Sequence, residues 1–406
     1  MSKYKNYEGG RFNVTIVGAG VVGVTIGREL QRRGVKRILI LEKEPDLGRH
    51  SSGRNSGVLH AGIYYPPGTL RARLCVEGAI ALRQYLEERK LPFAKCGKLI
   101  LPQEESLADQ IPLLRDRAEK NGVQVHEIGP TEIAEIEPAA RRASKALFSP
   151  NTWMFDPKEV LKSISKDFVE AGGILNLDDP YLSFEPKTGV IKSEKNQFVS
   201  GQLINAAGLW ADKVAHDLDV GKRYRILPFR GRYSKLRPEI AVKIRGLIYP
   251  VPDLDLPFLG VHVTRHLTGV VSLGPTAMPA WGRENYQGLN GLSVKDSVKN
   301  FAVLAEMILK NTERMRAHVV NESKLHFRSV LHKQLQKLVP SLEVTDVLPY
   351  EKVGLRAQVV DLKENRLCMD FLIEKGEKSL HVINAISPAF SASFAFAREV
   401  VDQLEI

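Results

Sequence analysis

The segment that decides the fold of this 406-residue chain reads GAGVVG and occupies residues 18–23. An apolar run at 12–17 precedes it and predicts a buried strand, and apolar side chains at 22, 26 and 30 then recur with the period of one helix face. A second apolar run follows at 36–41. The whole stretch is therefore predicted to form a strand–helix–strand unit.

The three glycines of this segment match the positions that a dinucleotide-binding turn requires. Gly18 permits the tight turn, Gly20 lets the backbone approach a pyrophosphate, and Gly23 lets helix and strand pack closely. The phosphates would lie at the helix N-terminus, where free N–H groups and the helix dipole favour an anion. Glu42 would accept hydrogen bonds from ribose hydroxyls, and Lys43 follows it directly. The alternative, a purely structural glycine-rich turn, does not explain why strand, helix and acid stand in register.

Three further segments distinguish FAD from a nicotinamide dinucleotide. SGRNSG at 52–57 offers small residues and donors along an extended nucleotide, INAAGLWAD at 204–212 is a strand running into a glycine turn, and NAISP at 384–388 opens the last helix. FAD bound across a domain would use such scattered segments, whereas a nicotinamide enzyme of ordinary layout would not need the C-terminal helix. Besides the glycines, Glu42 and Lys43, the predicted FAD contacts are Asn55, Ser56, Gly57, Ala207, Gly208, Gly354, Arg356, Ser387 and Pro388.

Elements typical of a nucleotide-binding domain occur at the start of the chain, in its middle and at its end. A strand-rich region at 228–273 and a helix-rich region at 295–337 lie between them. This order predicts an α/β protein in which a discontinuous Rossmann-type FAD-binding domain carries an inserted substrate-binding domain of antiparallel sheet and helices. The predicted boundaries are 1–84, 145–220 and 345–406 for the FAD-binding domain, and 85–144 and 221–344 for the substrate-binding domain.

Composition and charge exclude several classes of function. The three cysteines form no Cys-x-x-Cys pair, so neither a disulfide framework nor a metal site is predicted. The net charge of +11 is spread along the chain without a nucleic-acid motif, so no nucleic-acid partner is expected, although loose attraction to an anionic membrane is compatible with it. The polar start lacks a secretory or transit pattern, so we expect a cytoplasmic protein, or one held peripherally at the inner face of a membrane.

Ordered motifs along nearly the whole chain point to one family. They include NSGVLHAGIYY at 55–65, INAAGLWAD at 204–212, PFRG at 228–231 and GLRAQ at 354–358. With them the chain resembles the L-2-hydroxyglutarate dehydrogenases and oxidases of the D-amino-acid-oxidase-type FAD superfamily. The resemblance implies FAD, oxidation of L-2-hydroxyglutarate to 2-oxoglutarate, transfer of electrons to oxygen or a quinone-linked membrane carrier, and a role in clearing a metabolic side product. The departures from the family pattern are Arg54 for a usual histidine, Arg232 for a common acid and Ile386 for a usual proline.

The implied reaction needs a base and cationic groups. Oxidation of a secondary alcohol moves a hydride to flavin N5 and a proton to a base, for which His60 is the first candidate and His262 the second. The two carboxylates of the substrate call for guanidinium or ammonium partners. The candidate substrate contacts are Arg230, Arg356, Lys98, Tyr249 and Tyr64. Either histidine could instead be structural, and Arg356 could face the flavin.

Two other functions fit part of this pattern. A flavoprotein that oxidises an amino acid or glycerol 3-phosphate would share the glycine motif and the segment at 204–212. An amine substrate would call for an acidic or aromatic cage, whereas the basic and histidine-containing segments favour a dianion. A flavoprotein that only transfers electrons would bind FAD without being reduced by any 2-hydroxy acid. The response of bound flavin to different substrates would separate the three.

Overall fold

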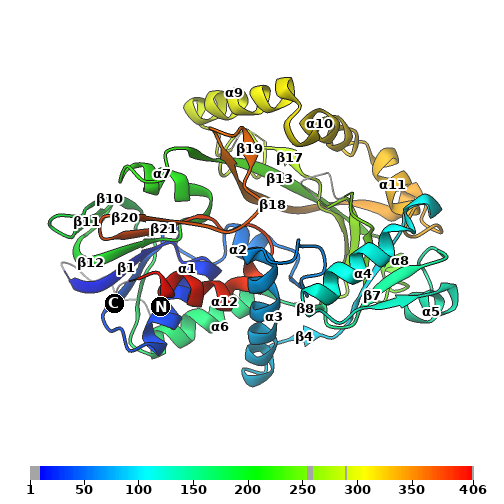
Figure 1. Cartoon of the computed structure of the whole chain (residues 1–406), viewed down its shortest axis with the longest axis horizontal. Helices are drawn as coiled ribbons and strands as arrows, with labels where there is room; N and C mark the ends of the chain where they lie inside the picture. Colours follow the sequence, from blue (N-terminus) through cyan, green and yellow to red (C-terminus); the bar gives the residue numbers. More distant parts are fainter. Residues whose placement is uncertain (1–9, 254–258, 289, 405–406) are drawn as a thin grey trace.

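The computed structural model describes residues 10–253, 259–288 and 290–404, and over these residues the chain forms two lobes, each built on a large sheet (Figure 1). The strand–helix–strand unit expected from the sequence is present as β1 (Arg11–Val17), α1 (Val21–Arg32) and β2 (Ile38–Leu41). β1 runs parallel to β2 on one side and to β12 (Gln197–Asn205) on the other, so apolar strands lie together at the centre of the first sheet. The other strands of this sheet are β9 (Ile174–Asn176), β10 (Tyr181–Glu185), β11 (Val190–Ser193), β20 (Leu372–Gly376) and β21 (Ser379–Asn384).

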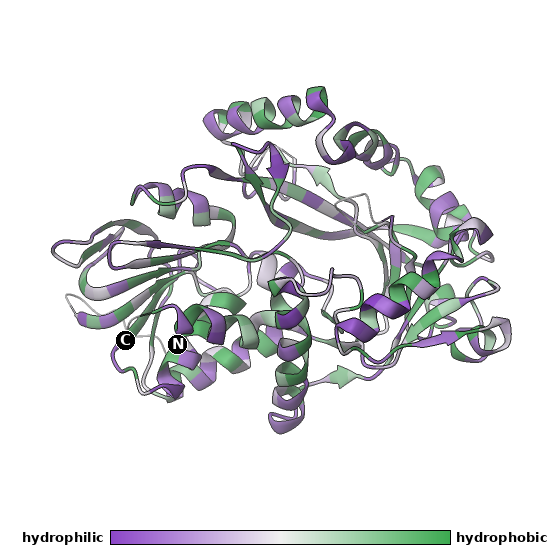
Figure 2. Cartoon of the chain, in the orientation of Figure 1, coloured by the Kyte–Doolittle hydropathy of each residue, from purple (hydrophilic) through white to green (hydrophobic). Residues whose placement is uncertain are grey.

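Helices cover the first sheet with apolar faces. α12 (Ala389–Asp402) packs against α1 and α3 (Leu70–Glu88), and Figure 2 shows it as a largely hydrophobic helix beside the strands. α6 (Pro157–Glu170) packs on the other side of α1. Asp156 caps the start of this helix, since its carboxylate accepts hydrogen bonds from the N–H groups of Lys158 and Glu159 at 2.8 and 3.2 Å.

The second sheet is organised by two long antiparallel strands, β13 (Tyr224–Leu236) and β18 (Val347–Asp361). The described strand pairs of this sheet are antiparallel, as the sequence predicted, except that β5 (Lys98–Leu101) pairs in parallel with β14 (Leu247–Pro250). The remaining strands are β6 (His126–Ile128), β7 (Ala146–Ser149), β15 (His262–Arg265), β16 (Val271–Gly274), β17 (Met278–Pro279) and β19 (Arg366–Leu367).

Strand pairing differs from the predicted domain boundaries at two places. β7 lies after the predicted boundary at 145, yet it pairs with β5 and β6 in the second sheet. β18 and β19 lie after the boundary at 345, yet they belong to the second sheet because β18 pairs with β13 along nearly its whole length. The local pattern of a strand shows which residues are buried, but it does not show which sheet the strand joins.

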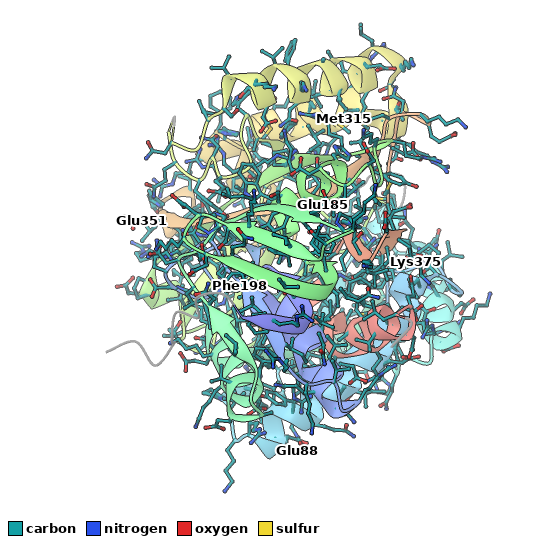
Figure 3. The ribbon with its side chains drawn as sticks, turned by 90° about the vertical axis from the view of Figure 1, so that its left-hand side faces the viewer. Glu88, Glu185, Phe198, Met315, Glu351 and Lys375 are labelled. Atoms are coloured by element: carbon teal, nitrogen blue, oxygen red, sulfur yellow. The ribbon has the colours of Figure 1, made fainter. Side chains whose placement is uncertain are left out.

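Helices of the second lobe lie on its outer surface. Figure 1 shows α9 (Val294–Lys310) and α10 (Met315–Lys324) over strands of the second sheet, and the side view of Figure 3 shows Met315 among these helices at the top. Met307, Met315 and Phe229 belong there to one buried apolar cluster. The helix-rich region predicted at 295–337 is thereby confirmed. The other helices are α2 (Ser51–Arg54), α4 (Gln110–Lys120), α5 (Pro130–Ile136), α7 (Ala211–His216), α8 (Pro238–Ala241) and α11 (Arg328–Gln336).

A small sheet connects the two lobes and places the first candidate base. It consists of β3 (Val58–Leu59), β8 (Trp153–Phe155) and β4 (Phe93–Ala94), with β8 in the middle. Val58 pairs with Met154 and Leu59 with Trp153, so His60 follows directly on a strand with a defined register. The backbone around His60 is therefore held by buried strand pairing.

A buried ion pair also connects the lobes. Arg283 and Asp212 are each 1% exposed, and the two guanidinium nitrogens lie 2.6 and 2.8 Å from the two carboxylate oxygens. Asp212 also accepts a hydrogen bond from the N–H of Ile226 at 3.0 Å, and Arg283 donates to the carbonyl of Leu209 at 2.5 Å. The glycine turn that follows β12 is thus fixed to a loop of the second lobe.

Replacing Arg283 by methionine should lower the free energy of unfolding by about 3–5 kcal/mol, because Asp212 would keep a buried charge without its partner. Urea denaturation followed by circular dichroism measures this change. Lys310→Met is the control, since Lys310 pairs with Glu306 on an exposed helix surface and should cost less than about 0.5 kcal/mol. Equal losses in the two variants would contradict a buried connection between the lobes.

Candidate active site

The glycine-rich turn between β1 and α1 has the geometry of a phosphate cradle. Gly18 has a φ of +103°, and a Cβ there would lie 2.6 Å from the carbonyl oxygen of Ala206. A Cβ on Gly23 would lie 2.0 Å from the Gly18 oxygen, so glycine is required there too. A Cβ on Gly20, at the N-terminus of α1, would instead meet only the Ser52 hydroxyl, at 3.1 Å, among the described atoms within 4 Å. The backbone therefore leaves space before the helix N-terminus, as a pyrophosphate requires.

The two charged residues after β2 are held by protein groups. Glu42 accepts hydrogen bonds from the N–H groups of Ala19 at 2.8 Å and Glu44 at 3.0 Å, so its carboxylate supports the glycine turn. Its contact with ribose stays a prediction. Lys43 forms ion pairs with Glu44 and Glu284, with Nζ–O distances of 2.5 and 2.8 Å, and is thereby turned toward the second lobe.

Glu44, His50 and Glu284 resemble a metal site, since one ligand atom of each lies within 4.8 Å of the others. His50 Nε2 lies 2.9 Å from the Glu44 carboxylate, and its Nδ1 lies 2.8 Å from the hydroxyl of Tyr286. Lys43 contacts both carboxylates and already supplies a positive charge there. The cluster therefore joins the residues before α2 to the loop at 284–286.

Helix α2 brings together predicted cofactor segments from distant parts of the chain. The Ser52 hydroxyl accepts a hydrogen bond from the N–H of Val21 in α1 at 2.9 Å. The Ser51 hydroxyl donates to the carbonyl of Leu355 in β18, also at 2.9 Å. A Cβ on Gly354 would lie 3.1 Å from the carbonyl of the last residue of α2. The glycine turn, the 52–57 segment and the 354–356 segment thus surround one short helix.

Asn55 fixes the course of the chain after α2. Its side-chain amide donates to the carbonyl of Ser52 at 2.8 Å, and its side-chain oxygen accepts from the N–H of Gly57 at 2.9 Å, with Ser56 between them. Gly57 has a φ of +72°, and a Cβ there would lie 2.3 Å from the carbonyl of Phe155. Asn55 and Gly57 therefore stabilise the backbone of this segment, in addition to any contact with FAD.

The remaining predicted cofactor residues lie at the carboxyl ends of parallel strands. Ala207 and Gly208 follow β12, and the Cα of Ala207 lies 3.2 Å from where a Gly18 Cβ would be. Ser387 and Pro388 follow β21, and Pro388 precedes the first residue of α12. Because β12 and β21 run parallel to β1, these residues reach the same edge of the sheet as the glycine turn.

Positive groups from several elements surround His60. Its backbone N–H donates to the Ser391 hydroxyl of α12 at 3.0 Å. Burial lowers the pKa of the His60 imidazole well below its usual value, and nearby positive charges lower it further; these charges belong to Lys98, His262, Arg71 and Arg356. The imidazole is therefore neutral at pH 7 and can accept a proton.

Lys98 on β5 is a buried lysine that lacks a carboxylate partner among the described residues. Its side chain is 1% exposed, and Nζ lies 4.5 Å from the ring centroid of Tyr64 and 5.2 Å from that of Tyr249. Burial lowers the pKa of Lys98 to about 7. The Tyr64 hydroxyl is also buried, and no described residue accepts or donates a hydrogen bond there. Buried polar groups without protein partners indicate the place of a polar ligand.

His262, the second candidate base, packs against Tyr249. The two rings stack with centroids 3.9 Å apart at an angle of 23°. His262 is 5% exposed, its Nδ1 lies 3.0 Å from the carbonyl of Gly260, and burial lowers its pKa to about 3. With Nδ1–H donating to that carbonyl, Nε2 carries the lone pair that could accept a proton.

The structure separates the two arginines that were predicted to bind substrate together. Across the β13–β18 pair, Arg356 lies opposite Phe229, whereas Arg230 lies opposite Leu355. Neighbouring residues of a strand point to opposite faces of the sheet, so Arg356 and Arg230 project from different faces. Arg356 is close enough to His60 and His262 to lower the pKa of both, and Arg230 lies beyond the sheet from them.

Arg71 is a residue of this cluster that sequence reasoning missed. It lies in the first turn of α3, its Nε donates to the Ser387 carbonyl at 2.8 Å, and its guanidinium lies 4.3 Å from the ring centroid of Tyr65. A positive charge in the first turn of a helix is unfavourable next to the helix dipole. An arginine at this position, two residues after the N-cap residue Thr69, could therefore have indicated in the sequence that Arg71 serves a purpose other than helix stability.

Comparison with known proteins assigns the class. The family model described as FAD dependent oxidoreductase matches residues 13–403. The reduced, FAD-bound L-α-glycerophosphate oxidase of Mycoplasma pneumoniae has the same fold, with a TM-score of 0.75 and 22% identity over 97% of this chain and 94% of that one. Glycine oxidase of Bacillus cereus also shares the fold, with a TM-score of 0.68 and 16% identity over 97% and 96%. The protein is an FAD-dependent oxidoreductase, and the open space before α1 fits the pyrophosphate of that cofactor.

Curated relatives define the family more narrowly. The mitochondrial L-2-hydroxyglutarate dehydrogenase of Nematostella vectensis is 38% identical over 97% of this chain and 90% of its own length. The human mitochondrial protein of that name is 34% identical over 97% and 89%, and the Indibacter alkaliphilus protein is 34% identical over 96% and 98%. The chain belongs to the L-2-hydroxyglutarate dehydrogenase family, as the motifs predicted.

Proposed function

We propose that this protein oxidises L-2-hydroxyglutarate to 2-oxoglutarate. The observation that carries the proposal is that the buried Lys98 and the partly buried Arg71 and Arg356 surround a neutral His60. A dianion with a hydroxyl between its carboxylates satisfies both the cations and the base. The names of the relatives at 34–38% identity support the same substrate.

The proposed roles follow from charge and position. Arg356, Arg71 and Lys98 bind the two substrate carboxylates, because guanidinium and ammonium groups form strong charge-assisted hydrogen bonds with them. Tyr64 donates to the bound acid through its buried hydroxyl, and Tyr249 supports Lys98 with its ring face. FAD, when bound, accepts the hydride from C2 at N5.

His60 takes the hydroxyl proton, with His262 as the second candidate. In the free protein the surrounding cations disfavour the imidazolium form of His60. Two substrate carboxylates bring two negative charges into the same region, so they offset these cations and make proton acceptance by His60 easier. Binding of the substrate is thereby expected to make His60 a stronger base than it is in the free protein.

The chemistry of the cluster argues against the rival substrates. An amino acid would bring an ammonium group toward three cations, which repel it. Glycerol 3-phosphate carries its negative charge at one end, whereas the cations here come from β5, α3 and β18 and approach His60 from different elements. A dehydrogenase also needs an electron acceptor, and oxygen or a quinone-linked carrier is the proposed one.

Anaerobic titration of the FAD-loaded protein tests the proposed function. L-2-Hydroxyglutarate should bleach the flavin absorbance, whereas the D-isomer, glycerol 3-phosphate and D-alanine should leave it nearly unchanged. Bleaching by glycerol 3-phosphate or by D-alanine would assign the protein to a rival substrate. A flavin that no 2-hydroxy acid reduces would indicate an electron-transfer module.

Replacing Lys98 by methionine should weaken L-2-hydroxyglutarate binding at pH 6.5 at least about 30-fold, since a buried charge pair would lose one partner. In the unmodified protein, affinity should fall as the pH rises above 7, because Lys98 with its pKa of about 7 loses its proton there before substrate binds. The methionine variant should lose this part of the pH dependence. Flavin reduction at varied substrate concentration and pH measures both effects.

Lys235→Met is the matched control for this substitution. Lys235 also rests on a tyrosine ring, with Nζ 5.7 Å from the centroid of Tyr350, but it is only partly buried and acts on none of the groups around His60. Affinity and its pH dependence should remain unchanged in this variant. An equal effect of the two substitutions would remove Lys98 from the proposed substrate site.

Peripheral membrane association has a suitable surface in α9. Val294, Val298 and Phe301 are 82%, 64% and 56% exposed, they recur on one helix face, and Lys295 and Lys299 lie beside them. No helix in the described part of the chain is long and apolar enough to cross a bilayer.

Replacing Phe301 by glutamate should reduce co-sedimentation of the protein with anionic vesicles. Co-sedimentation equal to that of the unmodified protein would contradict a membrane-binding role of this surface. The proposed location is the cytoplasm, at the inner face of a membrane.

A further inference from the structure

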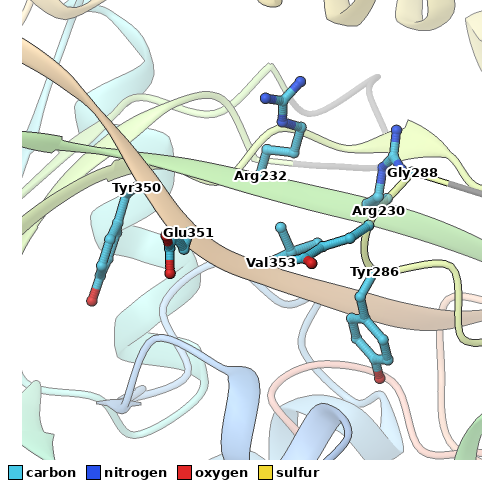
Figure 4. A pocket seen from close by; sticks show the side chains of 8 residues that line it. Arg230, Arg232, Tyr286, Gly288, Tyr350, Glu351 and Val353 are labelled. Atoms are coloured by element: carbon cyan, nitrogen blue, oxygen red, sulfur yellow. The ribbon is translucent and has the colours of Figure 1, made fainter. Parts of the chain in front are cut away.

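We propose that a cavity on the Arg230 face of the β13–β18 pair binds a small organic anion, at a site separate from the cation cluster around His60. The cavity has a volume of about 390 Å³ and is seen from close by in Figure 4. This is within the roughly 300–1,000 Å³ range of small-molecule sites. Its lining residues are Arg230, Arg232, Tyr286, Gln287, Gly288, Tyr350, Glu351 and Val353.

The two arginines of this cavity have no acid partner among the described residues. Figure 4 shows their guanidinium groups extending from β13 to the same side. Arg230 donates a single hydrogen bond, to the side-chain oxygen of Asn285 at 3.3 Å, and its Nε is buried without a partner among the described residues. Burial and the charge of Arg232 both lower the pKa of Arg230. Two neighbouring cations with an unused buried donor favour an anion between them.

A third arginine stands beside the cavity. The guanidinium of Arg54 lies 4.2 Å from the ring centroid of Tyr286, and it donates to the carbonyl of Val353 at 3.4 Å. Arg54 and Arg232 therefore both add positive charge at one place, and Glu351 is the only acid among the residues that line the cavity.

The register of β13 and β18 shows that this cavity is separate from the cation cluster around His60, which consists of Lys98, Arg71 and Arg356. Arg230 and Arg232 lie opposite Leu355 and Val353, whereas Arg356 lies opposite Phe229. Side chains of the first set therefore project from one face of the strand pair and Arg356 from the other. One bound dicarboxylate does not contact both sets, because the strand pair itself lies between them.

The lining defines the chemical class of the ligand. The guanidinium groups select a carboxylate or phosphate, which they can hold through two parallel hydrogen bonds. The rings of Tyr286 and Tyr350 and the side chain of Val353 offer apolar contact to the rest of the molecule. An aromatic carboxylate of about one ring satisfies both requirements better than inorganic phosphate alone.

Isothermal titration calorimetry of the FAD-loaded protein with terephthalate tests this site, with the Lys98→Met variant, whose cation cluster around His60 is weakened, titrated in parallel. We expect saturable binding that persists in Lys98→Met and weakens tenfold or more in both Arg232→Gln and Arg54→His. Arg366→Gln is the matched control, since Arg366 is exposed on the same sheet but does not line the cavity, and it should bind as the unmodified protein does. Inorganic phosphate in a parallel titration should bind more weakly.

The measured heat does not depend on turnover, so this test stays separate from that of the proposed function. Absence of saturable binding in the unmodified protein would overturn the site. Binding that is unchanged in Arg232→Gln and Arg54→His, or lost in Lys98→Met, would place terephthalate elsewhere and overturn it too. Phosphate binding more tightly than terephthalate would overturn the assigned ligand class.

Discussion

Glutamine in place of His60 should slow the reduction of bound FAD by L-2-hydroxyglutarate about 100-fold or more, while FAD stays bound. Glutamine keeps a comparable size and a hydrogen-bonding side chain, but it does not accept the hydroxyl proton. The backbone of residue 60 is held by β3 and by the Ser391 hydroxyl, so the local fold should survive. Anaerobic stopped-flow absorbance at saturating substrate measures the rate.

The pH profile sharpens this prediction. Because burial and the neighbouring cations keep the pKa of His60 well below 6.5, its proton-accepting form prevails from pH 6 upward in the free protein. The rate constant for flavin reduction at low substrate concentration, which reports the protonation state of the free protein, should therefore not fall between pH 7 and 6 through protonation of His60. A loss of rate over that interval would show that the base titrates higher than the surroundings of His60 indicate.

Two further histidine variants complete the experiment. His332→Gln is the control, since His332 is partly buried in α11, where its Nε2 lies 2.8 Å from the carbonyl of Leu342, far from the cation cluster. It should reduce FAD at the unmodified rate. An undiminished rate in the His60 variant, with a large loss in His262→Gln, would transfer the role of base to His262.

Gly20→Leu should yield folded protein that lacks FAD and is colourless. The Cβ of residue 20 would point into the space before α1, near the Ser52 hydroxyl, and the rest of a leucine side chain would fill the volume of the pyrophosphate. Gly20 has a φ of −68°, which leucine adopts without strain, so the substitution should act on the cofactor rather than on the fold. The absorbance ratio of flavin to protein measures FAD content.

Gly129→Leu is the matched control, because Gly129 also precedes a helix, α5, with a φ of −98°, and a Cβ there meets no described atom within 4 Å. This variant should keep its full content of FAD. Circular dichroism should show native secondary structure in both variants. Yellow Gly20→Leu protein with normal FAD content would contradict the placement of the pyrophosphate at this turn.

Local spacing in the sequence was sufficient for the elements of the first lobe. The predicted runs at 12–17 and 36–41 largely coincide with β1 and β2, and Asp156 caps α6, whose first residue is Pro157. Such elements are determined by the period of apolar residues and by capping groups a few positions away. The roles of the three glycines could be predicted in the same way, since the tight turn and the close contact of Gly23 with Gly18 lie within six residues.

Contacts between residues distant in the sequence determine which sheet a strand joins and which cations surround His60. β18 has the burial pattern of many strands, and only its pairing with β13 places it in the second sheet. The same pairing puts Arg230 and Arg356 on different faces, which residue types alone do not reveal. Arg71 was missed because its contacts with Ser387 and Tyr65 join segments that only the folded chain brings together.

The amino-acid sequence on its own determined the dinucleotide turn, the order of the main elements and the family, because each of these depends on residue types at short, regular spacing. Only the tertiary structure decided which cations surround His60, that Lys98 is buried without an acid partner among the described residues, and that a second group of arginines lies behind the sheet. Burial and electrostatic environment are sums over neighbours from many segments, so they exist only once the chain has folded.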